Sequence, residues 1–197
     1  SDVCSSDLGD SIRMAYAGGV AALLDGVVEI VEIPENGGDS ANLLAKLPGW
    51  LDAVDPATID VAYVNCGLHD IKRAFASDER QVDLEAYTVN VRAVLLMLRE
   101  RVAGEVIWAS STPVVYERHH ARKGFDRFDA DVLEYNAAAN AVAEELGAAT
   151  HDLYSVIADD DVPGRLGEDG VHMTQRGNDL LVDRVAERLR AALAPTP

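Results

Sequence analysis

The residues of this 197-residue chain that could do covalent chemistry lie in two short motifs near its opposite ends. The first motif is Gly9-Asp10-Ser11, and the second is Asp169-Gly170-Val171-His172. A serine hydroxyl is a weak nucleophile until a base removes its proton, and histidine suits that task near neutral pH. We therefore expect Ser11 to be the nucleophile and His172 its base. Asp169, three residues earlier, would orient the imidazole and stabilise its cation, as a catalytic triad requires.

A serine that attacks a carbonyl group also needs N–H donors directed at the oxyanion that forms. We expect three donors: the backbone N–H of Ser11, the backbone N–H of Gly38 and the side chain of His69. Glycine at position 38 would let the backbone approach a substrate without a Cβ in the way. Neutral imidazole carries one N–H, so His69 can donate if its tautomer is held correctly. Losing one such donor typically costs about 3–4 kcal/mol of transition-state stabilisation.

Each of these residues also has a structural interpretation. An Asp-Ser pair after a strand is often a helix N-cap, and taken alone Ser11 fits that description, as Ser40 does. Asp169 and His172 would then belong to an ordinary loop followed by a cap, and His69 would be a hydrogen-bonded histidine at a strand end. The catalytic interpretation therefore depends on where the fold places the motifs relative to one another.

The elements that must position the motifs follow from an alternation of apolar runs and helical patterns. Short segments rich in β-branched residues predict strands at 26–33, 59–66, 105–111 and 148–154, after a first strand before Gly9. Apolar residues at 3.6-residue spacing predict helices at 83–101, 128–147 and 174–193. Another helix, beginning near Asp39, is expected to be interrupted near Pro48 and Gly49.

Alternating strands and helices predict an α/β fold, a three-layer α/β/α sandwich with a flavodoxin-like parallel sheet of about five strands. Because 48% of the residues are hydrophobic and no linker divides the chain, we expect one domain over residues 1–197. The segments 9–11, 36–40 and 67–70 each follow a predicted strand, and 169–172 precedes the last helix. Ligands bind at the carboxyl edge of such sheets. The four segments should therefore gather along one rim.

In this order the four motifs resemble the sequence blocks of the SGNH hydrolases, a family also called GDSL-type esterases and lipases. GDS resembles the first block, Gly38 the glycine of the second, Gly67-Leu68-His69-Asp70 the third, and the D-x-x-H of 169–172 the fifth. The third block is usually G-x-N-D, so His69 stands where the family has Asn. Thr112-Pro113-Val114 and Tyr135-Asn136 resemble a branch of the family that has GLHD in this block. The resemblance covers nearly the whole chain.

The resemblance implies a serine esterase that forms an acyl-enzyme on Ser11 and needs no metal or other cofactor. It favours a short acyl group, such as acetyl on a carbohydrate, and the chain has no long apolar stretch suited to lipid chains. Three alternatives stay open. An acyltransferase or a thioesterase would use the same triad, and a non-catalytic sugar-binding domain could have the same scaffold. A metal-dependent phosphoesterase would use as ligands Asp10, Asp39, His69, Asp70 and His172.

A basic segment at 117–127, ERHHARKGFDR, lies beyond the predicted strand 105–111. We interpret it as a loop that forms the lip of a substrate site, in which Arg118, Arg122 or Arg127 contacts polar or anionic groups on a sugar. The alternative is a solvated surface loop. The adjacent histidines 119–120 lack the carboxylate spacing that would indicate a metal site.

Charge and composition narrow the range of partners. The formal net charge of -17 argues against nucleic acid, whose phosphates would be repelled. The sequence contains no run of about 18 apolar residues, the length that a membrane-spanning helix needs. The expected partner is therefore a small-molecule or carbohydrate ester. The two cysteines, Cys4 and Cys66, are too few for a disulfide scaffold, and the apolar run around Cys66 predicts a buried thiol.

The first eight residues, SDVCSSDL, are unusually polar for the central strand that should precede Ser11. Our hypothesis is that residues 1–7 are not native sequence and that an apolar strand originally preceded GDS. The rival interpretation is a short, distorted and partly exposed strand. Since the chain does not begin with Met, we also expect that the natural N-terminus is missing, which leaves both a cytoplasmic and a secreted location open.

Overall fold

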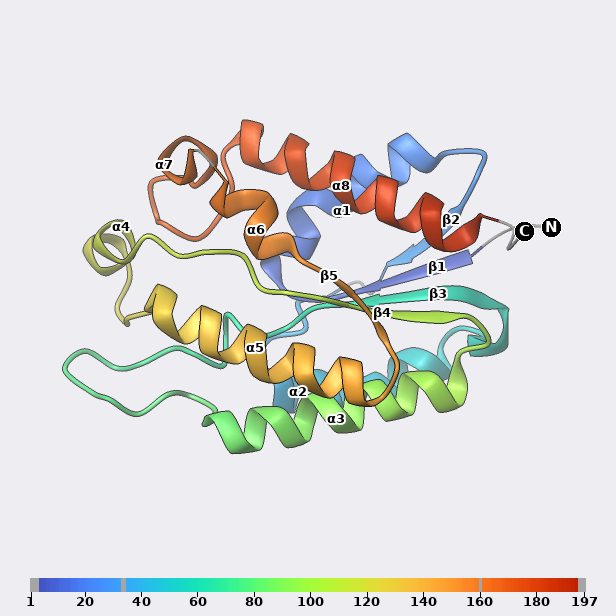
Figure 1. Ribbon diagram of the computed structural model, residues 1–197, viewed down its shortest axis with the longest axis horizontal. Helices are drawn as coiled ribbons and strands as arrows, with labels where there is room; N and C mark the ends of the chain where they lie inside the picture. The colour runs from blue at the N-terminus through green and yellow to red at the C-terminus, as the bar shows by residue number, and fades with distance from the viewer. Residues whose placement is uncertain (1–3, 33–34, 160, 195–197) are drawn as a thin grey trace.

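The computed structural model describes residues 4–32, 35–159 and 161–194 and has a five-stranded parallel sheet at its centre (Figure 1). The strand order is β2-β1-β3-β4-β5, and every neighbouring pair is parallel. The strands are β1 Cys4–Leu8, β2 Glu29–Glu32, β3 Ile59–Val64, β4 Glu105–Ala109 and β5 Ala149–His151. This order confirms the predicted flavodoxin-like sheet. Its strands are shorter than the predicted ones, and residue 33 of the predicted second strand lies outside the described residues.

Helices cover both faces of the sheet (Figure 1). On one face α1 (Ser11–Leu24) packs against α8 (Gln175–Leu193), and the shorter α6 (Leu153–Ala158) packs beside α8. On the other face α3 (Leu84–Arg101) packs between α2 (Ser40–Asp52) and α5 (Asp129–Glu145). Short helices η1 (Pro56–Thr58), α4 (Tyr116–Arg122) and α7 (Val162–Arg165) complete the described chain. The three layers and the helices predicted at 83–101, 128–147 and 174–193 are confirmed, with bounds that differ by one or two residues.

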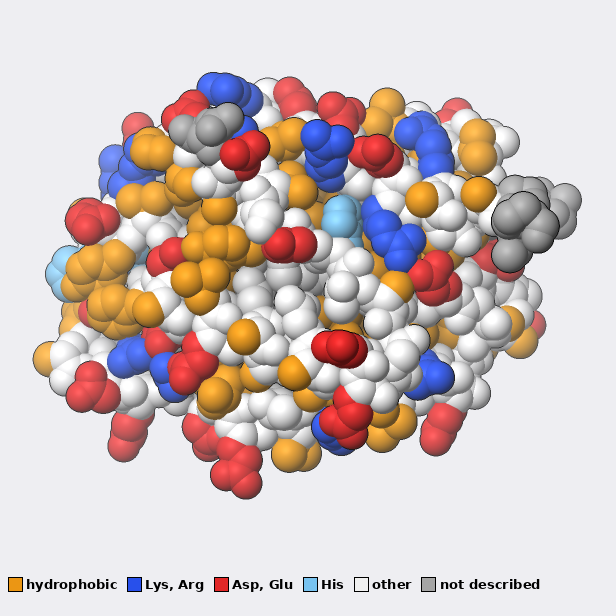
Figure 2. All heavy atoms as spheres, viewed as in Figure 1, with side chains coloured by type: hydrophobic (Ala, Val, Ile, Leu, Met, Phe, Trp, Pro, Cys, Tyr) orange, Lys and Arg blue, Asp and Glu red, His pale blue; other side chains and the backbone are white. Residues whose placement is uncertain are grey.

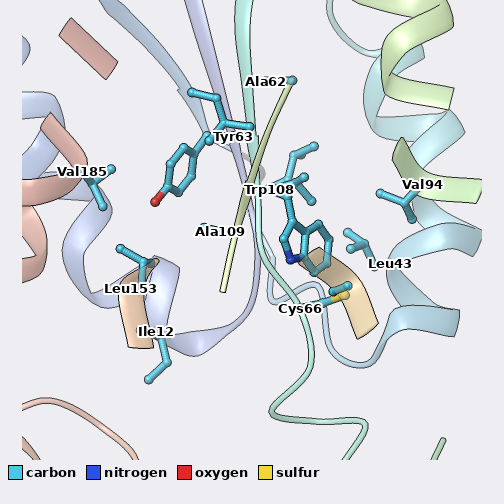
Figure 3. Close-up of a cluster of buried hydrophobic side chains, with 14 of the residues drawn as sticks. Ile12, Leu43, Ala62, Tyr63, Cys66, Val94, Trp108, Ala109, Leu153 and Val185 are labelled. Carbon is cyan, nitrogen blue, oxygen red and sulfur yellow. The ribbon is translucent and has the colours of Figure 1, made fainter. Parts of the chain in front are cut away.

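The two faces of the sheet have separate apolar cores. Tyr63 of β3 points toward α1, α6 and α8, where it lies near Ile12, Leu153 and Val185 (Figure 3). Trp108 of the neighbouring β4 points the opposite way, toward Leu43 of α2 and Val94 of α3 (Figure 3). Both aromatic side chains are fully buried. Successive side chains of a strand alternate between faces, so β3 and β4 supply both cores.

Two predictions of local structure were wrong. Helix α2 continues through Pro48, because Leu43, Leu47 and Leu51 recur every four residues and bury one continuous apolar stripe on the sheet. Packing of that stripe compensates for the backbone hydrogen bond that proline cannot make. The segment predicted as a loop at 117–127 contains helix α4. Figure 1 shows α4 beyond the carboxyl ends of the strands, beside the loop that leads to α8.

The polar first strand is an interior strand of the sheet and lies between β2 and β3. Ser5 and Asp7 are buried, with exposed fractions of 0% and 3%, and Leu8 after them is buried too. Among the described residues the hydroxyl of Ser5 has no hydrogen-bond partner. An unsatisfied buried hydroxyl costs about 1–3 kcal/mol. Residues 1–3 of the segment that we interpret as foreign lie outside the described residues.

Two further predictions concern Cys66 and the membrane. Cys66 is buried, as its apolar surroundings predicted, and its thiol is free. Burial raises the pKa of this thiol well above the usual value. No helix in the described part of the chain is long and apolar enough to cross a membrane.

Candidate active site

Ser11 is the first residue of helix α1, directly after the carboxyl end of β1. The N-cap of this helix is Asp10, whose carboxylate accepts a hydrogen bond from the backbone N–H of Ile12 at 2.9 Å. Ser11 therefore does not serve as the cap. Its Oγ lies 2.9 Å from Nε2 of His172, although 161 residues separate the two in the sequence. The first N–H groups of a helix have no acceptor within the helix, so the backbone N–H of Ser11 is available to a bound group.

His172 and Asp169 form the second half of the same polar chain. Nδ1 of His172 lies 2.6 Å from Oδ2 of Asp169. Oδ1 of Asp169 accepts the backbone N–H groups of Val171 and His172 at 3.1 and 3.0 Å, and the ammonium of Lys123 lies 3.2 Å from Oδ2. Partial burial acts to raise the pKa of Asp169, but hydrogen bonds from His172, Val171 and Lys123 outweigh it and hold this pKa well below the usual range. The carboxylate is therefore ionised beside the imidazole.

The loop that carries Asp169 and His172 is held by helix α4. The backbone N–H of Val115 donates to the carbonyl of Gly170 at 2.8 Å. Gly170 has φ +70°, and a Cβ at this position would lie 2.3 Å from the carbonyl oxygen of Val115. Glycine is therefore required both by the left-handed backbone and by the close approach of α4. This contact explains how the D-G-V-H motif can hold Asp169 and His172 in a fixed arrangement.

The three arginines predicted to contact substrate have three different environments. The guanidinium of Arg118 donates to the carbonyls of Pro163, Leu166 and Gly167 at 2.9, 2.7 and 3.3 Å, so it binds the chain that leads to Asp169. Arg122 is exposed and pairs with Glu168 at 2.8 Å. Arg118 and Arg122 are thus engaged within the protein and do not line the cavity beside Ser11.

Arg127 is different, because it is 5% exposed and lines the same cavity as Ser11 and His172. Its Nε donates to the carbonyl of Leu68 at 2.6 Å. Within the part of the chain that the structure describes, its two terminal nitrogens have no hydrogen-bond partner. Burial lowers the pKa of Arg127 to about 10, partly offset by Asp10 and Asp169, so the side chain remains a cation at neutral pH.

The loop after β2 places Asn36, not the expected Gly38, at the cavity. The backbone N–H of Gly38 donates to the side-chain Oδ1 of Asn36 at 2.8 Å. Gly38 has φ +69°, which accounts for glycine at this position, while the backbone of Gly37 donates to the carbonyl of Gly9 at 2.8 Å. The predicted donor at Gly38 is therefore occupied in this structure. Because Oδ1 of Asn36 accepts this bond, the NH₂ group of Asn36 is left to donate elsewhere.

The loop after β3 brings His69 to the cavity and Asp70 away from it. Both carboxylate oxygens of Asp70 accept the backbone N–H of Ser40, at 2.9 and 3.1 Å. Burial raises the pKa of Asp70 to about 7, although the hydrogen bonds from Ser40 oppose this. Burial, with Lys72 and Arg127 nearby, lowers the pKa of His69 to about 4. His69 is therefore neutral at physiological pH and carries a single N–H donor.

The cavity beside Ser11 has a volume of about 280 Å³. Its lining combines the polar side chains just described with three apolar ones, and consists of Asp10, Ser11, Asn36, Leu68, His69, Lys72, Lys123, Phe125, Arg127, Val171 and His172. Three of these residues are cationic, in a protein whose visible surface carries acidic side chains over its whole extent with basic ones between them (Figure 2). A second hollow, of about 510 Å³, shares Lys72 and Phe125 with the first.

The proposed metal-ligand set does not come together. In residues 4–32, 35–159 and 161–194, no three His, Cys, Asp or Glu side chains are arranged to hold a metal ion. Asp39 caps α2 through the N–H of Asn42 at 2.9 Å, and Asp70 is committed to Ser40. These carboxylates therefore fix the loops around the cavity.

Sequence reasoning missed four residues of the site: Asn36, Lys72, Lys123 and Phe125. Asn36 had a signal, because Asn before two glycines favours a turn in which the side chain binds the backbone two residues on. Lys72 lies three residues after His69, and a single turn can bring two side chains at this spacing into contact. No sequence signal indicated Lys123 or Phe125, because the segment 117–127 does not reveal which of its side chains face inward.

The sequence from residue 6 to residue 180 matches the model of the GDSL-like lipase/acylhydrolase family. No curated protein matches the chain. Similar solved structures include an acetyl xylan esterase, AlAXEase, at 18% identity and a TM-score of 0.76, covering 95% of this chain and 100% of that one. A lipase/acylhydrolase from Enterococcus faecalis aligns at 18% identity and a TM-score of 0.78, over 99% of both chains. The acetylxylan esterase Axe2 from Geobacillus stearothermophilus aligns at 18% identity and a TM-score of 0.72, over 96% of this chain and 94% of that one.

Proposed function

The chain belongs to the GDSL-like lipase/acylhydrolase family and is a carboxylic ester hydrolase, and we propose that it works through an acyl-enzyme on Ser11. The observation that carries the proposal is the unbroken line of contacts from Ser11 through His172 to Asp169, with distances of 2.9 and 2.6 Å. Elements from the two ends of the chain have to meet to form it. A structural N-cap serine would not need an imidazole partner.

The mechanism follows from the order of these contacts. Nε2 of His172 accepts the proton of the Ser11 hydroxyl as Oγ attacks the ester carbonyl. Asp169 keeps the proton of His172 on Nδ1 and stabilises the imidazolium that forms. The imidazolium then protonates the departing alcohol, which leaves an acyl group on Ser11. A water molecule, deprotonated by the same imidazole, hydrolyses this acyl-enzyme and restores the serine.

The oxyanion requires donors that are fixed before the reaction begins. We assign the backbone N–H of Ser11 and the side chain of His69 to this role, and the backbone N–H of Gly38 once a substrate oxygen has displaced Oδ1 of Asn36. His69 thus takes the place that Asn has in the family's usual third block, in keeping with the GLHD branch that the sequence resembles. The NH₂ group of Asn36 is available to bind the same oxygen or a neighbouring one.

The substrate class is a short acyl ester of a carbohydrate or similar polar alcohol. A cavity of about 280 Å³ beside Ser11 is small for a ligand site and suits an acetyl group better than a long chain. The adjoining hollow of about 510 Å³ has room for a sugar ring, which could pack on Phe125. Arg127 is buried, and its terminal nitrogens have no hydrogen-bond partner among the described residues, so they would bind a polar or anionic group of the substrate. Two of the similar structures are named as acetyl xylan esterases, which favours the same class.

The test is covalent labelling with a fluorophosphonate probe, with the labelled residue located by mass spectrometry. We expect label on Ser11, and its loss in His172→Ala. Ser40 is an internal control, because it also is the first residue of a helix after an aspartate cap. Its hydroxyl accepts a hydrogen bond from Asn90, and no histidine among the described residues is bonded to it. Label on both serines, or on neither in the folded protein, would contradict the proposal.

The substrate class has its own assay. We expect p-nitrophenyl acetate to be cleaved with a higher kcat/KM than the octanoate ester, and an acetylated sugar to be a substrate. The variant Phe125→Ala should raise KM for the acetylated sugar more than for p-nitrophenyl acetate, because only the sugar would reach the adjoining hollow. A preference for the octanoate ester would contradict the short-acyl assignment.

A further inference from the structure

The turn after β3 brings the ammonium of Lys72 against the imidazole of His69. The backbone N–H groups of Asp70 and Ile71 both donate to the carbonyl of Gly67, at 3.0 and 3.2 Å, so the chain folds into a single tight turn. Side chains three residues apart on such a turn lie on the same side. As a result Nζ of Lys72 lies 3.0 Å from Nδ1 of His69.

Lys72 is held in this position from two other directions. Its backbone carbonyl accepts the N–H of Gln81 at 2.7 Å, which fixes the chain after the turn. Its ammonium lies 5.3 Å from the centroid of the Phe125 ring, a distance at which a cation is attracted to the aromatic face. The lysine side chain therefore lies between His69 and Phe125, both of which line the cavity of Ser11.

The chemistry of this contact selects one form of the imidazole. An ammonium group has three N–H donors and no lone pair, so Nδ1 of His69 must be the acceptor. The lowered pKa of His69, about 4, means that the ring is neutral and carries a single proton. With Nδ1 unprotonated, that proton resides on Nε2. Within the described part of the chain Nε2 has no hydrogen-bond partner, so its N–H is free to bind a substrate oxygen.

We propose that Lys72 is a positioning residue that holds His69 in the Nε2–H tautomer and in the ring orientation that serve the oxyanion. The proposal rests on the function proposed above. An asparagine amide has both its donor hydrogens on one nitrogen and needs no tautomer selection. A histidine at the same place has two nitrogens that can exchange roles. A neighbouring group that only donates removes this ambiguity.

The first test reads the tautomer directly and requires no activity. Long-range ¹H–¹⁵N NMR of the protein with ¹⁵N-labelled histidine, near pH 7, should show an unprotonated Nδ1 and a protonated Nε2 for His69. The signals of this residue among the five histidines are identified by their loss in His69→Phe. In Lys72→Met the same signals should move toward a mixture of the two tautomers. A protonated Nδ1 in the unaltered protein would overturn the proposal.

The second test is a double-mutant cycle. Lys72→Met should lower kcat/KM about tenfold, within the limit of the roughly 10²–10³-fold that one complete oxyanion donor contributes. In the His69→Phe background, which has no donor to position, Lys72→Met should have almost no further effect. An equal loss in both backgrounds would overturn the proposal, because the lysine would then act through its own charge.

The matched control is Lys123→Met, which removes another cation from the same cavity. Lys123 contacts Asp169 and not His69, so its loss should cost the same factor in both backgrounds and leave the His69 tautomer unchanged. The NMR result also separates this inference from the proposed function. A protein with the Nε2–H tautomer, lost in Lys72→Met, but without an acyl-enzyme on Ser11 would support the tautomer selection and overturn the proposed mechanism.

Discussion

Replacing Arg118 by methionine should lower stability and kcat, whereas replacing Arg127 by methionine should raise KM. Arg118 makes three contacts with backbone carbonyls of 163–167, which lead into the loop of Asp169 and His172. A hydrogen bond from a charged donor contributes about 1.5–3 kcal/mol, but water can reach this partly exposed site and recover some of it. We therefore expect Arg118→Met to lower the free energy of unfolding by about 2 kcal/mol.

That loss has a measurable size. For a chain of this length 1 kcal/mol corresponds to about 2–4 °C in Tm, so Tm should fall by about 4–8 °C. Because the loosened loop carries His172 and Asp169, the proposed base and its orienting carboxylate, kcat should fall while KM changes little. Arg127→Met should instead raise KM for a polar sugar ester about tenfold, the equivalent of about 1.4 kcal/mol of lost binding.

Thermal unfolding and steady-state kinetics on the same preparations give both quantities. Arg122→Met is the matched control, because Arg122 lies on the same helix and its ion pair with Glu168 is at the surface. Such pairs contribute about 0–1 kcal/mol, so this variant should keep a Tm close to that of the unaltered protein. The reasoning is refuted if Arg118→Met keeps its Tm within about 1 °C and raises KM, since Arg118 would then contact substrate.

Three further outcomes follow from individual contacts. Gly170→Ala should lower both Tm and kcat, because its Cβ would lie 2.3 Å from the carbonyl oxygen of Val115; an unchanged Tm would contradict this contact. Ser5→Ala should raise the free energy of unfolding by about 1 kcal/mol, read from denaturant titration, and a loss would mean that the hydroxyl has a partner. Burial, with Arg188 nearby, lowers the pKa of His151 to about 4, below its unfolded value of about 6.5. The unfolded chain therefore binds the proton first, so stability should fall from pH 6.5 toward 4, and His151→Gln should show a shallower fall.

Much of the fold could be predicted because it depends on local pattern. The spacing of Leu84, Tyr87, Val91, Val94 or Leu95, and Leu98 predicts α3. The structure buries all of these side chains except Leu84, which is partly buried. The order of strands and helices predicts the parallel sheet, and the strand ends then gather the four motifs at one edge. Pro48 shows the limit of local rules, because tertiary packing of α2 outweighs the cost of a proline in the helix.

The sequence by itself also determined which residues could form a nucleophile, a base and its partner, since each short motif specifies a turn, after a strand for Ser11 and before the last helix for Asp169 and His172. Only the tertiary structure decided which partners the longer side chains contact. Arg118 turns to the backbone of 163–167, Arg127 lies buried at the cavity, and Lys72 lies against His69. The physical reason is that a turn is fixed by its own few residues. The partner of a long flexible side chain is fixed by the packing of segments that the sequence keeps far apart.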